Sequence, residues 1–249
     1  MRPLAPSPSS LLPLLAALMI ALAPLPAAAF RLIPIEMELQ PSGRGATQIF
    51  RIENDGKEPV AVEVKVMARA MGMEGEDVLT EDTENFVVFP EQIILQPNEN
   101  QSIRVQWVGN PNPDRELSFR LIAEQLPIDI GKPAPQGGQV RLLVKYVASL
   151  YIVPPTAAPK VSVLSAKPAD TPAGKALEVV LRNDGTARKV LRDATLAVQA
   201  GGGSVTLAGQ EQLAGLVGEN LLGGTTRRFL VPWPAGLAAG PVSATLNVP

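Results

Sequence analysis

The sequence predicts an all-β protein made of two antiparallel β-sandwich domains of the immunoglobulin type. Short runs rich in Val, Ile, Leu and Phe recur between turn residues at intervals of about 8 to 12 positions, which is typical of sandwiches. After the first 29 residues, no stretch has the apolar period of a surface helix. A proline-rich segment, PPTAAP at 154–159, is a stiff linker that divides the chain into two parts.

Residues 1–29 have the pattern of a secretory signal peptide. Arg2 gives the positive start, residues 11–23 form a short apolar core, and Ala27 to Ala29 form a small-residue cleavage site. We expect cleavage after Ala29, which makes Phe30 the first residue of the exported protein. No later segment approaches the roughly 18 uninterrupted apolar residues of a membrane-spanning helix, so we expect no membrane insertion.

The composition argues against several classes of protein. The 249 residues include no Cys and no His, which removes disulfides, the usual zinc ligands and the commonest catalytic base. We therefore expect neither an enzyme nor a metal or cofactor site. Residues 30–153 carry 12 Lys and Arg against 18 Asp and Glu, and residues 160–249 carry 9 against 6. Neither balance favours a nucleic-acid partner.

The first domain, 30–153, begins with a strand at 30–39 that Pro34 interrupts. Because proline cannot donate to a ladder, this strand must lie at an edge or switch sheets at Pro34. Residues 47–53 and 60–67 are predicted to pair as two strands joined by a tight turn at Asn54-Asp55-Gly56.

The rest of the first domain contains an acidic segment and further strands. Residues 68–84 carry six Asp and Glu without the spacing of a calcium loop, which predicts a solvated acidic loop. Alternating or short apolar runs predict strands at 85–90, 91–96, 101–108 and 116–127.

One predicted strand is unusually long. Residues 138–154, GQVRLLVKYVASLYIVP, place Val140, Leu142, Val144 and Tyr146 on one face at a spacing of two. A strand of some fifteen residues is about three times the usual length. The excess suggests that part of this strand pairs with another chain.

The second domain, 160–249, is also predicted to be all-β. Its expected strands are 160–165, 176–183, 190–199, 204–208, 218–222, 227–231 and 242–248. The tripeptide Asn-Asp-Gly follows a strand in both halves, at Asn54 and at Asn183, which supports two related sandwiches.

Four stretches of the chain resemble the PapD-like periplasmic pilus-assembly chaperones of the chaperone/usher pathway. They are FRIENDG (50–56), FPEQIILQPNENQSIRVQW (89–107), ELSFRLIAEQLP (116–127) and SLYIVP (149–154). The resemblance covers the whole exported chain and is strongest in the first domain. Its pattern is that of a divergent member, similar to the archaic chaperones.

The resemblance implies an L-shaped pair of domains in the periplasm that binds, folds and caps pilus or fimbrial subunits and passes them to an outer-membrane usher. A subunit is an incomplete sandwich, and the chaperone lends its long edge strand to fill the groove. On this resemblance the lent residues are Val140, Leu142, Val144 and Tyr146.

The family's carboxylate anchor is missing from this sequence. The resemblance implies an Arg on the first strand and a Lys on the long strand, but Glu38 and Ser149 occupy those positions. Because a carboxylate favours a guanidinium or ammonium partner, Arg31 and Lys145 are the nearest basic candidates.

Two other functions are compatible with the sequence. A two-domain immunoglobulin-like structural or adhesive surface protein would use the long strand for self-association, which a free chaperone could also do. A carbohydrate-acting enzyme would need a carboxylate pair, for which Glu36 and Glu38 on one strand face are candidates, although a solvated strand edge explains them more simply.

Overall fold

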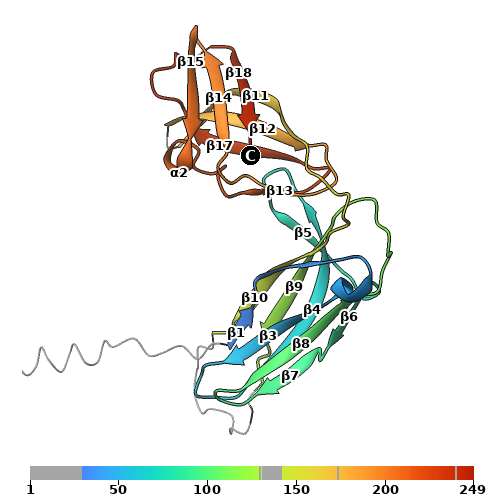
Figure 1. Cartoon of the computed structure of the whole chain (residues 1–249). Helices are drawn as coiled ribbons and strands as arrows, with labels where there is room; N and C mark the ends of the chain where they lie inside the picture. The colour runs from blue at the N-terminus through green and yellow to red at the C-terminus, as the bar shows by residue number, and fades with distance from the viewer. Residues whose placement is uncertain (1–29, 129, 131–141, 173, 239) are drawn as a thin grey trace, which may run out of the picture.

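The computed structural model describes residues 30–128, 130, 142–172, 174–238 and 240–249. Two β-sandwiches meet at an angle, so that the chain has the predicted L shape (Figure 1). The predicted all-β fold class is confirmed, since strands make up nearly all of the regular structure. Within the described ranges, no helix has the length and apolar character needed to cross a membrane.

The first domain consists of two sheets packed face to face. Its elements are β1 (Phe30–Ile33), β2 (Glu36–Leu39), η2 (Gly43–Ala46), β3 (Thr47–Asn54), β4 (Val60–Met71), β5 (Asp77–Glu81), β6 (Phe86–Phe89), β7 (Gln92–Leu95), β8 (Asn100–Trp107), β9 (Leu117–Gln125) and β10 (Lys145–Ile152). One sheet has the order β1-β3-β8-β6. The other has the order β2-β10-β9-β4-β5, and β7 also pairs with β4.

The first strand switches sheets at Pro34, as one of the two predicted alternatives required. β1 pairs antiparallel with β3 in one sheet, whereas β2 pairs parallel with β10 in the other. Pro34 has no N–H to donate, so neither ladder can continue through it. The crossing places β2 beside the C-terminal half of β10 only, where Ser149 pairs with Glu36 and Ile152 with Leu39.

The predicted hairpin between 47–53 and 60–67 is wrong. β3 pairs with β1 and β8, while β4 lies in the opposite sheet. The side chain of Asn54, 1% exposed, donates from Nδ2 to the carbonyls of Glu58, Leu95 and Gln96 at 2.9–3.1 Å. The turn residue is therefore a buried connection between the sheets, because the amide satisfies carbonyls that the crossing chain leaves unpaired.

The prediction of a solvated acidic loop at 68–84 is also wrong in its first part. β4 continues to Met71 and forms an antiparallel hairpin with β5, in which Met71 pairs with Asp77. The tip of this hairpin reaches the second domain, where the backbone N–H of Arg228 donates to the Met73 carbonyl at 2.7 Å. Two of its acidic residues pair with arginines: Asp77 with Arg69 and Arg120, and the half-exposed Glu74 with Arg228.

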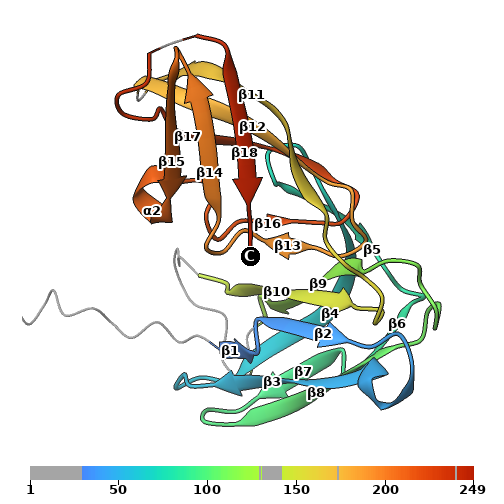
Figure 2. The ribbon, with the colours of Figure 1, turned by 45° about the horizontal axis from the view of Figure 1, so that its top comes forward.

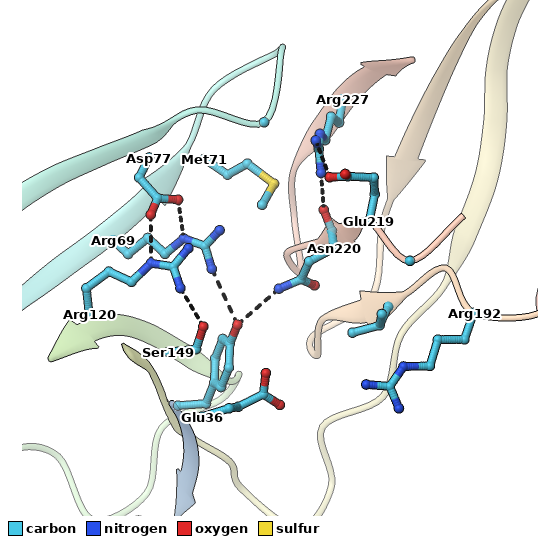
Figure 3. Close-up of a pocket in the computed structure, with 14 residues that line it drawn as sticks. Glu36, Arg69, Met71, Asp77, Arg120, Ser149, Arg192, Glu219, Asn220 and Arg227 are labelled. Carbon is cyan, nitrogen blue, oxygen red and sulfur yellow. Dashed lines mark hydrogen bonds and ion pairs between the residues drawn. The ribbon is translucent and has the colours of Figure 1, made fainter. Parts of the chain in front are cut away.

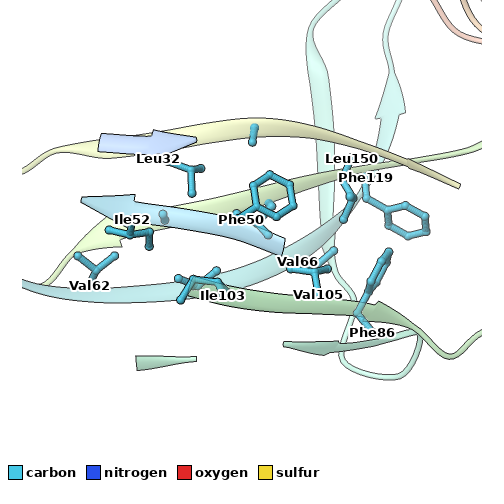
Figure 4. Close-up of a cluster of buried hydrophobic side chains, with 14 of the residues drawn as sticks. Leu32, Phe50, Ile52, Val62, Val66, Phe86, Ile103, Val105, Phe119 and Leu150 are labelled. Carbon is cyan, nitrogen blue, oxygen red and sulfur yellow. The ribbon is translucent and has the colours of Figure 1, made fainter. Parts of the chain in front are cut away.

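The core of the first domain lies between its two sheets (Figure 4). Alternate residues of β3, β4, β8, β9 and β10 point inward, as the period of two predicts. At one end the ring of Phe86 packs edge-on against Trp107 and Phe119, whose own rings are tilted to each other, with centroids 4.8–5.7 Å apart. This single core holds the domain together without disulfides.

The second domain is a smaller sandwich that lies over one end of the first (Figure 2). Its elements are β11 (Val161–Thr171), β12 (Gly174–Asn183), β13 (Lys189–Val190), β14 (Thr195–Ala200), β15 (Gly203–Ala208), α2 (Gly209–Gln212), β16 (Asn220–Leu221), β17 (Thr226–Pro232) and β18 (Val242–Asn247). The sheets have the orders β11-β12-β17 and β15-β14-β18, and β13 pairs with β16. The strand expected at 190–199 is divided between β13 and β14.

Asn183 repeats in the second domain the role of Asn54 in the first. It is fully buried, and its Nδ2 donates to the carbonyls of Ala187 at 2.9 Å and Leu221 at 3.1 Å. In both domains the Oδ1 of the asparagine accepts the N–H of the glycine two residues later. The shared tripeptide therefore marks the same buried asparagine turn in both domains.

The long strand is shorter than predicted within the described residues. β10 begins at Lys145 and ends at Ile152, and Leu142 to Val144 precede it without strand assignment. Residues 138–141 lie outside the described residues. Of the described residues before β10, Leu142 and Leu143 are exposed, and the backbone carbonyl of Val144 accepts from the N–H of Gln125 at 2.9 Å.

Candidate functional site

An open cleft of about 560 Å³ lies where the two domains meet. The first domain lines it with residues of β4, β5, β9 and β10, and the second with residues around β16 and the start of β17 (Figure 3). Polar and charged side chains make up most of its wall. The chemistry of this cleft is therefore that of a site for a charged group.

The floor of the cleft is an ion cluster centred on Asp77. Its carboxylate accepts from Nε of Arg69 and from Nε of Arg120, each at 2.6 Å, as Figure 3 shows. Burial raises the pKa of Asp77, but the hydrogen bond from Arg120 and the charge of Arg69 outweigh it, so the pKa lies below its ordinary value of 3.8. One ionised carboxylate thus faces two guanidinium groups, which leaves a net positive charge.

Further hydrogen bonds orient the two arginines toward β10. Nη1 of Arg120 donates to the hydroxyl of Ser149, and Nη1 of Arg69 donates to the hydroxyl of Tyr151 at 3.3 Å. Nδ2 of Asn220, from the second domain, donates to the same Tyr151 hydroxyl at 3.0 Å. The cleft arginines, Arg69 and Arg120, are therefore held by side chains of the first domain, and the Tyr151 hydroxyl links Arg69 to Asn220 of the second.

A third arginine, Arg188, joins the domains beside the cleft. Its guanidinium donates to Glu116 and to Glu38 at 2.6 Å and lies 3.4 Å from Glu36, and its Cζ lies 3.6 Å from the centre of the Tyr151 ring. Glu116 is only 4% exposed. Burial raises its pKa, the Arg188 charge opposes this, and the net pKa lies above the ordinary 4.5.

The second-domain wall of the cleft contains two polar atoms without partners in the described part of the chain. Arg227 donates to Glu219 at 2.6 Å and to the Asn220 carbonyl at 2.8 Å, but its Nε is buried and unpaired. Oδ1 of Asn220 is also buried and unpaired. Neither atom was singled out by the sequence.

β10 has an unpaired edge that leads into the cleft. β9 pairs with β10 along Lys145–Ile152, whereas β2 covers the other side only from Ser149 onward. On that side, no strand of the described residues pairs with 145–148. The N–H of Ser149 donates toward β2, so the backbone groups of Lys145 and Val147, which alternate with it, face the open edge.

The predicted donor residues lie at the start of this edge. Leu142 is 78% exposed, the most exposed of the large apolar side chains described. Val144 and Tyr146 are half-buried against the core, where the Tyr146 ring packs on Phe30 with centroids 5.1 Å apart. Val140 lies outside the described residues.

The two predicted anchor residues lie away from the cleft. Arg31 pairs with Glu53 at 2.9 Å and with Asp55 at 2.6 Å, and Lys145 pairs with Glu124 at 3.5 Å. The glutamates proposed as a catalytic pair, Glu36 and Glu38, both face Arg188.

Sequence reasoning missed the cleft arginines, Asp77 and Arg188. Arg120 had a signal, because it stands in the stretch ELSFRLIAEQLP that carries the resemblance. Asp77 had none, since it was one of six acidic residues in a segment without a strand pattern. Among the described residues, no group of three or more His, Cys, Asp or Glu could hold a metal ion.

The angled sandwiches and the charged cleft between them define a two-domain immunoglobulin-like protein with a binding cleft. Residues 39–158 match the family model of the pili and flagellar-assembly chaperones, PapD N-terminal domain. The first domain, which this match covers for the most part, therefore belongs to the PapD-like chaperones of the chaperone–usher family. No curated protein matches its sequence.

Solved structures of fimbrial chaperones share the fold. The class 5 fimbriae chaperone CfaA has a TM-score of 0.54 at 16% identity, and the match covers 89% of this chain and all of CfaA. A chain of the CsuC–CsuE chaperone–tip adhesion subunit complex of Acinetobacter baumannii has a TM-score of 0.56 at 16% identity. The match covers 87% of this chain and 98% of that one. A chain of the Salmonella enterica complex of the SafA pilin with the SafB chaperone has a TM-score of 0.50 at 15% identity. The match covers 91% of this chain and 99% of that one. A general role in pilus assembly follows from the family.

Proposed function

We propose that this protein is a periplasmic chaperone that binds pilus subunits by strand donation, caps them, and delivers them to an outer-membrane usher. The observation that carries the proposal is the unpaired edge of β10, preceded by the exposed Leu142. In strand addition, main-chain hydrogen bonds supply affinity and alternate side chains supply fit. An edge of this kind needs a partner strand or protection from one.

The lent residues are Val140, Leu142 and Val144, with Tyr146 at the base of the segment. Burial of each aliphatic side chain in a guest pocket is worth about 1.5–3 kcal/mol, so three of them outweigh any exposed ion pair. The contact between Tyr146 and Phe30 supports a division of the strand. Residues before Tyr146 are offered to the guest, and residues from Ala148 onward complete the protein's own sandwich.

We further propose that the cleft arginines, Arg69 and Arg120, receive the terminal carboxylate of the guest. Together they share a single carboxylate, that of Asp77. Arg120 also donates to Ser149, where the open edge of β10 ends, and Arg69 donates to Tyr151 two residues further on. A carboxylate arriving along that edge meets a net positive charge. Arg31 and Lys145 remain candidates, but each already faces an acidic partner outside the cleft.

Export and domain organisation belong to the same proposal. The signal at 1–29 is removed after Ala29, and Phe30, which is fully buried, becomes the first residue. The N-terminal domain is 30–153, the linker 154–159 and the C-terminal domain 160–249. The two separate apolar cores support this division. N-terminal sequencing of periplasmic protein tests the cleavage site.

The test of strand donation is a pull-down from native periplasm with mass-spectrometric identification of the captured protein. We expect a pilus subunit in a one-to-one complex. Leu142→Asp and Val144→Asp should abolish the complex, while Leu164→Asp, which changes another exposed leucine, in β11 (61% exposed), should retain it. Retained binding by both donor variants, or homopolymers instead of hetero-complexes in native mass spectrometry, would overturn the proposal.

The carboxylate site is tested with a peptide that copies the C-terminal strand of the captured subunit. The free acid should bind the wild-type protein more tightly than the C-terminal amide. Arg120→Gln should remove this preference, whereas Arg31→Gln and Lys145→Gln should keep it. If instead Arg31→Gln or Lys145→Gln removes the preference, the anchor lies where the sequence alone placed it.

A further inference from the structure

Ile35 is an exposed apolar residue at the point where the open edge of β10 ends. It lies between Pro34 and the first residue of β2, and 67% of its surface is exposed. The core cluster of the first domain does not include it. Its exposure is therefore not explained by the packing of its own domain.

The backbone fixes the place of Ile35 beside β10. The N–H of Ser149 donates to the Ile35 carbonyl at 2.8 Å. The parallel register continues with Ser149 opposite Glu36, so Ile35 stands beside Ala148. Ala148 is the last residue of the unpaired stretch of the edge.

Ile35 lies on the face of the sheet that also carries the proposed donor residues. In β2 the side chains of Met37 and Leu39 turn toward the core, and the period of two extends this face to Ile35. In β10 the corresponding face carries Tyr146 and Ala148. Val144, just before β10, also packs against the core, and the period of two extends this face to Leu142.

β2 cannot extend beyond Ile35 to cover the edge itself. Pro34 has no N–H, and Ile33 already pairs with Arg51 of β3 in the other sheet. A guest strand added to residues 145–148 therefore runs in line with β2. The end of the guest strand meets Ile35.

We propose that Ile35 is a specificity-determining residue, which contacts an apolar side chain near the end of the guest strand. Ile35 thereby extends the apolar face of the lent residues from β10 to the start of β2. The inference rests on the proposed strand donation. An apolar guest residue removes Ile35 from water, whereas a charged residue would lose solvent there without a partner. Ile35 thus selects guests whose strand ends with an apolar residue.

The test compares three variants against the subunit identified in the pull-down and against its C-terminal strand peptide. Ile35→Asp should bind about tenfold more weakly than the wild-type protein, a factor that corresponds to about 1.4 kcal/mol. Ile94→Asp, a matched change at a 54% exposed isoleucine of β7, should bind like the wild type. Ile35→Leu should retain affinity, and unfolding curves should be unchanged because the side chain is exposed.

A substituted peptide sharpens the test. Replacing the apolar residue nearest the end of the strand by Asp should weaken binding to the wild type more than binding to Ile35→Asp. Wild-type affinity of Ile35→Asp, with Leu142→Asp still inactive, would overturn the role of Ile35 and leave strand donation intact. Equal losses in Ile35→Asp and Ile94→Asp would also overturn it. Retained binding by Leu142→Asp would instead remove the proposed function and this inference with it.

Discussion

Two groups of charged residues lie side by side at the domain junction and differ in their balance of charge. In one, the single guanidinium of Arg188 faces three carboxylates, those of Glu36, Glu38 and Glu116. In the other, the cleft arginines face the one carboxylate of Asp77. The first group has an excess of negative charge and the second an excess of positive charge.

The difference separates the structural role of Arg188 from the binding role that we propose for Arg69 and Arg120. Arg188 and Glu116 come from different domains, so their ion pair joins the domains. Arg69, Arg120 and Asp77 all belong to the first domain, and their cluster lines an open cleft. The charge of Arg188 is fully balanced by carboxylates of the protein, so its ion pairs hold the domains together. Arg69 and Arg120 share one carboxylate, so their remaining positive charge can attract an anion.

The largest effect is expected from Arg188→Met, which keeps the length of the side chain and removes its charge. Glu116 would remain buried without its partner, and breaking such a pair costs about 3–5 kcal/mol. Trp107 reports on the first domain and Trp233 on the second. Urea unfolding is followed by tryptophan fluorescence in proteins that keep only one of the two tryptophans. The two transitions should coincide in the protein with Arg188, and in the Arg188→Met variant they should separate and move to lower urea concentration.

The double variant Arg188→Met with Glu116→Gln is the control for this experiment. It removes the unpaired charge and should recover part of the lost stability. Arg228→Met removes an exposed ion pair with Glu74 and should leave both transitions in place. Coincident transitions in Arg188→Met at the wild-type midpoint would mean that the ion pair does not couple the domains.

The sequence predicted the fold class because strand periodicity and turn residues are local signals. The alternation of Val60, Val62 and Val64, for example, identified β4 correctly. It could not identify the sheet to which β3 and β4 belong. That choice depends on the buried amide of Asn54, whose carbonyl partners include residues about 40 positions away.

The site was less predictable than the fold for the same reason. Asp77 lies eight residues from Arg69 but 43 from Arg120, and Arg188 lies 72 residues from Glu116. No local pattern records such pairs. The donor segment is a prediction that sequence reasoning could make, because its alternation is continuous along the chain.

The two groups should also respond to pH in opposite directions. The pKa of Asp77 lies below 3.8 in the folded protein, so its contribution to stability is present above that pH and is lost as the pH falls through the folded pKa. The pKa of Glu116 lies above 4.5 because of its burial. Its contribution is present below pH 4.5 and is lost as the pH rises through the folded pKa.

Variants of the two carboxylates separate these contributions. The stability difference between wild type and Asp77→Asn should shrink as the pH falls below 3.8. The difference between wild type and Glu116→Gln should fall as the pH rises above 4.5. Titration of the two side-chain carboxyls by NMR gives the folded pKa values directly. A Glu116 pKa below that of Asp77 would contradict the contrast between the groups.

Tyr151 touches both groups, and the smallest effect is expected from changing its hydroxyl alone. Tyr151→Phe leaves the ring against Arg188 and removes the acceptor used by Arg69 and Asn220. Loss of these hydrogen bonds should cost about 1 kcal/mol. A double-mutant cycle with Asn220→Ala should be non-additive, because both changes remove the same bond between the domains. An additive cycle would mean that the Tyr151 hydroxyl contributes nothing to the coupling of the two domains.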